Sequence, residues 1–245
     1  MALLNGFAKQ TYPNGDSYEG EHWRGKRQGS GTYFHVNCDR YEGEFVDDMM
    51  QGHGVYYYTG TESYEGAWEA NQRHGEGSMV YNDGSRYQGQ WIRDNRGGRG
   101  EMVGSDGSNY DGAWENDARH GQGTLKYKDG AVYIGGWHVN VRHGHGHMKQ
   151  ADGTTYEGEF VEDLACGKGK LWLVKDGSNY EGEFEGGRRS GEGKCVHENG
   201  DVFTGTWRFN QKQCGIMERA GGPTERIMYQ NDVMVRREVV ELSPK

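Results

Sequence analysis

Aromatic and charged residues alternate in short segments that return along the whole chain. Tyr156–Phe160 is typical, since Tyr156, Gly158 and Phe160 alternate with two glutamates. Successive side chains of a β-strand point to opposite faces. The segment therefore predicts a strand with an aromatic face and an acidic face.

The spacing of these segments is almost constant. Each opens with a Tyr or Phe, and successive openings lie 23 residues apart, except for one step of 24 between Tyr156 and Tyr180. A fixed period of this length is typical of repeat architectures. The opening aromatics are Tyr18, Tyr41, Tyr64, Tyr87, Tyr110, Tyr133, Tyr156, Tyr180 and Phe203.

Each repeat predicts a β-hairpin. In one repeat a polar tip at residues 69–74 follows the first strand, a second strand starts at the Gly-x-Gly of residues 75–77, and Asn82-Asp83-Gly84 ends it. Asp-Gly and Asn-Gly favour type I′ turns. The chain as a whole predicts an all-β fold, an elongated single-layer antiparallel meander of about nine hairpins that forms a twisted rod. The extra residue of the 24-residue step, within 171–175, predicts a β-bulge.

Glycine inside strands needs a physical reason, because it removes a side chain that could pack. Here glycines recur beside large rings, so we expect each ring to cover a glycine of a neighbouring strand. Only 33% of the residues are hydrophobic, which is too few for a packed two-layer domain. The ring row is then either the core or a shallow groove that binds a partner. The candidate partner-binding rings are Tyr64, Trp68, Trp91, Trp114 and Trp137.

The repeats resemble MORN (membrane occupation and recognition nexus) repeats, which combine Tyr-x-Gly-x-Trp, a polar tip, His-Gly-x-Gly and Asp-Gly. The resemblance covers roughly residues 6–216. It implies a non-enzymatic scaffold or spacer that binds other proteins in a ciliary or flagellar axoneme or another cytoskeletal assembly. The alternative is a phosphoinositide-binding membrane adaptor. A third possibility, the regulatory array of a lipid kinase or methyltransferase, requires a catalytic domain outside this sequence.

Three segments are expected: a half-repeat or cap at residues 1–17, the repeat array at 18–213, and a divergent cap hairpin and tail at 214–245. Residues 226–230 and 233–237 flank Asn231-Asp232 and predict the final hairpin. Terminal repeats are often atypical caps. The alternative is an edge that pairs with a partner or a second copy, as MORN proteins resembling this one dimerise through C-terminal repeats. The candidate residues are Ile227, Met228, Tyr229, Val233 and Val235.

Net charge, cysteines and targeting signals limit the possible partners and the cellular compartment. The net charge of −9 disfavours a general nucleic-acid binder. Four cysteines without a short spacing disfavour a disulfide framework, and the sequence predicts neither a secretory signal nor a membrane span. We therefore expect a cytoplasmic protein, and the resemblance adds the cytoskeleton and the axoneme.

Arginine recurs at one phase of the repeat, which places it at the hairpin tip. These arginines either pair with Asp47, Asp94, Asp117 and Asp163, or form a basic ladder for an acidic protein tail or a phosphoinositide. The six residues are Arg27, Arg73, Arg96, Arg119, Arg142 and Arg189.

Other chemistry is not favoured by the pattern. The paired acids, such as Glu157 and Glu159, recur in most repeats, whereas a catalytic pair needs one special pocket. Gly-x-Gly opens a strand here and does not join a strand to a helix, which disfavours a nucleotide site. We expect no catalytic residues, no cofactor and no metal. The weakly considered metal ligands are His138, His143, His145 and His147.

Overall fold

The computed structural model describes residues 3–230 and 233–240, and the regular structure of these residues is entirely β-strand. The chain divides into two compact units, residues 1–121 and 122–245, and each is described by itself. A membrane-spanning helix is not found in the described part of the chain.

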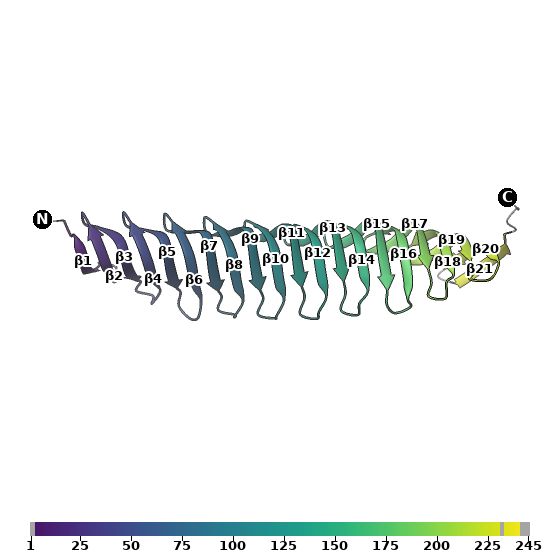
Figure 1. Ribbon diagram of the computed structural model, residues 1–245, viewed down its shortest axis with the longest axis horizontal. Helices are drawn as coiled ribbons and strands as arrows, with labels where there is room; N and C mark the ends of the chain where they lie inside the picture. The colour runs from purple at the N-terminus through teal and green to yellow at the C-terminus, as the bar shows by residue number, and fades with distance from the viewer. Residues whose placement is uncertain (1–2, 231–232, 241–245) are drawn as a thin grey trace. The chain divides into compact units, whose positions relative to one another are not determined.

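The first unit contains ten strands and the start of an eleventh (Figure 1). The ten strands are β1 (Gly6–Thr11), β2 (Ser17–Trp23), β3 (Lys26–Phe34), β4 (Arg40–Val46), β5 (Met49–Tyr57), β6 (Ser63–Glu69), β7 (Gln72–Val80), β8 (Arg86–Ile92), β9 (Asn95–Val103) and β10 (Asn109–Glu115).

Strand β11 (Ala118–Lys126) contains the boundary, and ten further strands follow it in the second unit. They are β12 (Val132–His138), β13 (Val141–Lys149), β14 (Thr155–Val161), β15 (Leu164–Leu173), β16 (Ser178–Glu185), β17 (Arg188–Val196), β18 (Val202–Arg208), β19 (Gln211–Glu218), β20 (Thr224–Gln230) and β21 (Val233–Val239).

Consecutive strands pair antiparallel from β1 to β10 and from β12 to β21. Within each unit the strands therefore follow one another as a meander of hairpins. This confirms the predicted all-β antiparallel meander of repeated hairpins.

The type I′ turns lie at the hairpin tips, opposite to the predicted place. Both residues of the two-residue turn Ala70-Asn71 have positive φ, 49° and 68°. In the loop of the same repeat only Gly84 has positive φ, and its N–H bonds to the Tyr81 carbonyl at 3.0 Å. The Asp-Gly segment is thus a three-residue loop, and the predicted type I′ turn there was wrong. In Figure 1 the short turns and the longer loops follow opposite edges of each unit.

The second strand of each hairpin begins earlier than expected and carries a bulge. Strand β7 begins at Gln72, and its register with β6 passes from Gly66↔Gly77 to Trp68↔Arg73. Three residues of β7 thus lie opposite Ala67 alone, and Gly75 in this bulge has a φ of 71°. Because two residues are inserted, Arg73 returns to the aromatic face.

Glycines face one another across the strands of each unit. In the first unit the register aligns Gly43, Gly54, Gly66, Gly77 and Gly89 on consecutive strands. A methyl group added at Gly66 or Gly77 would lie under 3.0 Å from the Tyr64 side chain. The prediction that rings cover bare backbone is confirmed, and the covering ring also lies over a glycine of its own strand.

The tyrosine and tryptophan rings form a continuous row within each unit. Trp91 contacts Tyr64 and Tyr87 edge-on, with centroids 5.3 Å apart in both cases. Its indole N–H donates to the Gly77 carbonyl of the preceding repeat at 3.3 Å. Each large ring therefore joins two repeats, and this row is the core of the unit.

The longer repeat has no bulge at residues 171–175. Leu171↔Tyr180, Trp172↔Asn179 and Leu173↔Ser178 pair without a register shift. The extra residue lengthens the end of the hairpin, so the predicted bulge was wrong. The final hairpin is present as β20 and β21, whereas its predicted turn at Asn231-Asp232 and the end of the predicted tail lie outside the described residues.

Candidate partner-binding surface

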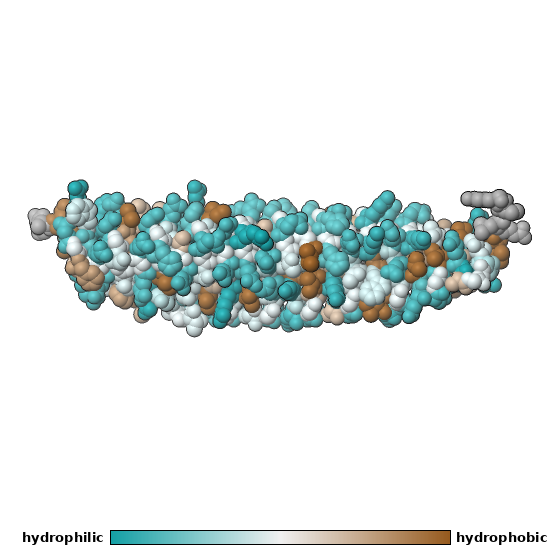
Figure 2. All heavy atoms as spheres, in the orientation of Figure 1, coloured by the Kyte–Doolittle hydropathy of each residue, from teal (hydrophilic) through white to brown (hydrophobic). Residues whose placement is uncertain are grey.

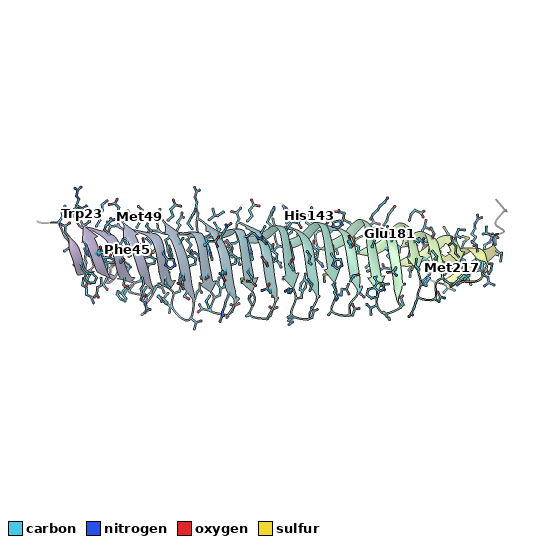
Figure 3. All side chains as sticks on the ribbon, in the orientation of Figure 1. Trp23, Phe45, Met49, His143, Glu181 and Met217 are labelled. Carbon is cyan, nitrogen blue, oxygen red and sulfur yellow. The ribbon has the colours of Figure 1, made fainter. Side chains whose placement is uncertain are left out.

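The five candidate rings lie in the core. Tyr64 is fully buried, and the four tryptophans expose between 2 and 6% of their surface. The first repeat keeps this plan with another residue, since His22 is buried in the place of the tryptophan and Trp23 points outward. Figure 3 shows Trp23 at the edge of the two-residue turns, whereas Phe45 lies over the strands. A partner meets the side chains above the rings before the rings themselves.

The arginine side chains are those covering groups. The guanidinium carbon of Arg73 lies 4.2 Å from the ring centroid of Trp91 and 5.7 Å from that of Tyr64. The bulge places Arg73 on this face, within strand β7 rather than in the turn. Arg27, Arg96, Arg142 and Arg189 repeat this arrangement. Arg119 lies over Tyr110 at 5.7 Å.

Arg27, Arg73, Arg96 and Arg142 are each held by an aspartate of the next hairpin, and Arg189 is held by Asn210. One Asp94 carboxylate oxygen accepts hydrogen bonds from the backbone N–H and from Nε of Arg73, at 3.0 and 3.2 Å. Nη2 of Arg73 donates to the Asp94 carbonyl at 2.9 Å. Asp94 is the second turn residue and has a φ of 69°. Arg96 and Arg142 are held in this way by Asp117 and Asp163, and Arg27 by Asp48 where the sequence suggested Asp47.

Replacing Arg73 should distinguish two contributions to stability, the packing of its side chain over the rings and its ion pair with Asp94. Met50 occupies the equivalent position of the second repeat, so Arg73→Met retains an apolar cover and should cost about 1 kcal/mol. Arg73→Ala also uncovers Trp91 and should cost about 2–3 kcal/mol.

Urea unfolding at low and high salt measures these free energies. Because salt screens only the ion pair, the difference between the methionine and alanine variants should persist at high salt. Equal losses for the two variants would contradict a covering role for Arg73.

The opposite face carries the acidic positions and differs between the units. In the first unit the cross-strand row contains five acids and one lysine among ten positions: Lys9, Glu19, Thr32, Glu42, Val55, Glu65, Ser78, Gln88, Glu101 and Asp111. In the second unit the row continues from His147 through Glu157, Lys170, Glu181 and Lys194, where glutamate and lysine alternate. Hydrophilic side chains dominate the view in Figure 2.

The acids one position before the tryptophan site also support the bulge. A Glu21 carboxylate oxygen accepts a hydrogen bond from the Ser30 backbone N–H at 3.3 Å, and Glu44 does the same for His53.

The four candidate metal-binding histidines do not converge on one point. His138 and His143 have ring centroids 5.6 Å apart, and His145 and His147 are exposed. Within the described ranges, three or more His, Cys, Asp or Glu are nowhere grouped as metal ligands would be.

The final hairpin divides its candidate residues between the core and the surface. Ile227 is fully buried, and Tyr229 continues the ring row with its centroid 6.0 Å from that of Phe203. Met228, Val233 and Val235 are exposed. Strand β21 is exposed along its whole length, with β20 as its described pairing partner.

The MORN repeat model matches the chain nine times, over more than half of its length. No curated protein matches the sequence at a significant level. The matched residues are 3–17, 18–37, 41–61, 64–86, 87–109, 110–132, 133–155, 156–177 and 180–202.

Two solved domains are similar in structure at low identity. The TCP10 domain of Danio rerio CPAP is 12% identical, with a TM-score of 0.45 over 81% of this chain and 94% of that one. The TCP domain of Drosophila melanogaster SAS-4, solved with a proline-rich motif of Ana2, is 11% identical, with a TM-score of 0.40 over 64% and 85%. Similarities at this level identify no partner for the present chain.

Proposed function

The chain belongs to the MORN repeat family, and we propose that it is a non-enzymatic scaffold that binds other proteins in a ciliary or flagellar axoneme or another cytoskeletal assembly. The observation that carries the scaffold proposal is that the two faces of the sheet have different roles. The ring face serves contacts between repeats, whereas the opposite face presents polar side chains at a regular spacing. The cytoskeletal setting rests on the resemblance to MORN proteins of cilia and flagella.

The C-terminal edge supports self-association within this proposal. Strand β21 pairs with β20 among the described residues and carries the exposed side chains of Met234 and Val235 beside the charged Arg236, Arg237 and Glu238. An unpaired apolar edge strand is a template for pairing with another strand. We therefore include a homodimer through the C-terminal hairpin in the proposed function.

Phosphoinositide binding has less support. Arg27, Arg73, Arg96 and Arg142 donate to aspartates of their own chain and Arg189 donates to Asn210, and the outer row of the first unit contains five acids. Lys168, Lys170 and Lys194 are exposed cations of the second unit that line one hollow, which they share with glutamates. A membrane role therefore predicts that these three lysines control binding to lipid.

Detergent extraction of ciliated cells that express the tagged chain tests the proposal. We expect the chain to remain in the detergent-insoluble axonemal fraction, and proximity labelling there should identify protein neighbours. Vesicles containing a phosphoinositide provide the opposing assay. Complete extraction by detergent, with vesicle binding that is lost when the three lysines become glutamate, would replace the scaffold proposal by the membrane proposal.

A further inference from the structure

The cover of arginines over the rings is interrupted in the seventh repeat. Ala165 pairs with Phe160 in β14 and β15, as Arg73 pairs with Trp68 in the third repeat. The next hairpin has Gly187 in the turn where Asp94 clamps Arg73, and the Gly187 N–H bonds to the Ala165 carbonyl at 2.9 Å. Both members of the ion pair are therefore replaced by small residues at one place.

The replacement leaves a groove on the ring face of the second unit. The groove has a volume of about 540 Å³ and runs beside β15 from Ala165 and Gly187 toward Lys175. Tyr156 is 7% exposed, more than any other opening tyrosine of the repeats. The wall combines polar residues with the apolar side chains of Met148, Phe160, Leu171, Leu173 and Phe184.

Other departures from the repeat keep a long side chain at the arginine position. Met50 replaces the arginine in the second repeat with a long apolar side chain, and Tyr41 there is fully buried. Lys212 takes the position in the last repeat, with Nζ 5.1 Å from the Phe203 ring centroid. The repeat that lacks the cover is also the one with 24 residues, in which β15 is extended to Leu173.

We propose that this groove binds an extended segment of a partner protein through an apolar side chain seated over Tyr156 and Phe184, with an acidic residue near Lys175. The proposal rests on the scaffold function and names one of its docking sites. Strand β15 has 10 residues, so a segment of similar length can lie beside it.

The charges at the groove select this occupant. Lys175 is exposed and has no ion pair among the described residues, which favours a carboxylate beside it. Arg142, Arg189 and Lys175 line the gap together with two carboxylates, Asp152 and Asp163, and Asp163 is paired with Arg142, so cations outnumber acids there by one.

Filling the gap gives a variant that should fold. Asp48, Asp94, Asp117 and Asp163 occupy the equivalent turn position at φ between 65° and 71°, close to the 77° of Gly187. Ala165→Arg with Gly187→Asp therefore rebuilds the arrangement of the other repeats. Its midpoint of urea unfolding should equal or exceed that of the natural chain.

Selection from a library of random 10-residue peptides, displayed on phage, tests the proposal with the purified full-length chain. We expect enriched peptides to combine an apolar residue with Asp or Glu. Their affinity should fall about tenfold or more for the filled variant, because it removes the apolar seat. The control combines Ala113→Arg on the outer face with Gly107→Asp in a loop, where a Cβ meets no atom within 4 Å, and should bind like the natural chain.

The other outcomes overturn the proposal. Peptides that bind the natural and filled chains equally would place the site elsewhere, and peptides enriched in Arg or Lys would mean a cationic occupant. A sedimentation coefficient that falls only in the filled variant would mean a second copy. Failure to enrich any peptide would also refute the groove as a peptide site. Because the selection uses purified protein, the scaffold proposal and its cellular test can fail independently of it.

Discussion

The Gly77→Ala variant is expected to lose about 3 kcal/mol of its free energy of unfolding, at the upper end of the usual cost of overpacking. A methyl group at Gly77 would lie under 3.0 Å from the Tyr64 ring. The ring cannot easily move, because its hydroxyl donates to the Ala67 carbonyl at 2.9 Å and the ring packs nearly perpendicular to Trp68 and Trp91. Urea unfolding followed by circular dichroism measures the loss.

A double-mutant cycle identifies the cause of this loss. If the methyl group acts through the ring, Gly77→Ala should cost much less in a Tyr64→Ala background, and the coupling should account for most of the effect. Gly107→Asn is the matched control, because Gly107 has a φ of 87°, a conformation that Asn tolerates, and a Cβ there meets nothing within 4 Å. Similar losses for Gly77→Ala and Gly107→Asn would show that the ring does not need bare backbone.

The chain should unfold cooperatively as the pH rises from about 10 toward 12. Burial raises the pKa of Tyr18, Tyr110, Tyr133 and Tyr180 to about 12 and also raises that of Tyr41, Tyr64, Tyr87 and Tyr156. Because the folded state holds the neutral phenol, its stability is complete below pH 10 and declines through the folded pKa. Each such tyrosine removes up to about 1.4 kcal/mol per pH unit.

Tyrosinate absorbance and circular dichroism measured together test the alkaline transition. The two signals should change at the same pH, since the buried phenols ionise only when the sheet opens. Phe203 occupies the tyrosine position of the last repeat, so Tyr133→Phe is a tolerated change that should move the midpoint to higher pH. Ionisation of the phenols near pH 10, with the strands retained, would contradict their burial.

The sequence was sufficient for the repeat, its two faces and the cover of glycine by aromatic rings. These features follow from local periodicity, because side chains two residues apart share a face. Tyr64, Gly66 and Trp68 therefore identify the ring face without any knowledge of the neighbouring strand.

The turns were beyond local reasoning. Val139-Asn140 and Phe209-Asn210 adopt positive φ at the hairpin tips although neither contains glycine. Their conformation is imposed by the twist of the two paired strands, which overrides residue preference. Asp83-Gly84 has the stronger local signal but forms a three-residue loop, because the register on both sides leaves room for one more residue.

The candidate site was only partly predictable. The common phase of the arginines was visible, but the two-residue bulge that turns Arg73 onto the rings depends on strand register. For the same reason the gap at Ala165 can be recognised only when the positions of Phe184 and Gly187 beside it are known. A search for positions where a repeat loses the arginine and the next turn loses its aspartate would have found it.

The indole-to-glycine hydrogen bonds have a consequence for how such chains lengthen. Trp91 bonds to Gly77 one repeat back, and Trp68 bonds to Gly54 in the same way. If one 23-residue unit were duplicated in tandem, the tryptophan at each new junction would therefore find the same glycine carbonyl in the preceding unit. Genes of this kind can gain or lose a unit in a single recombination event without any compensating substitution, so related proteins are expected to differ in repeat number more readily than in the residues beneath the rings.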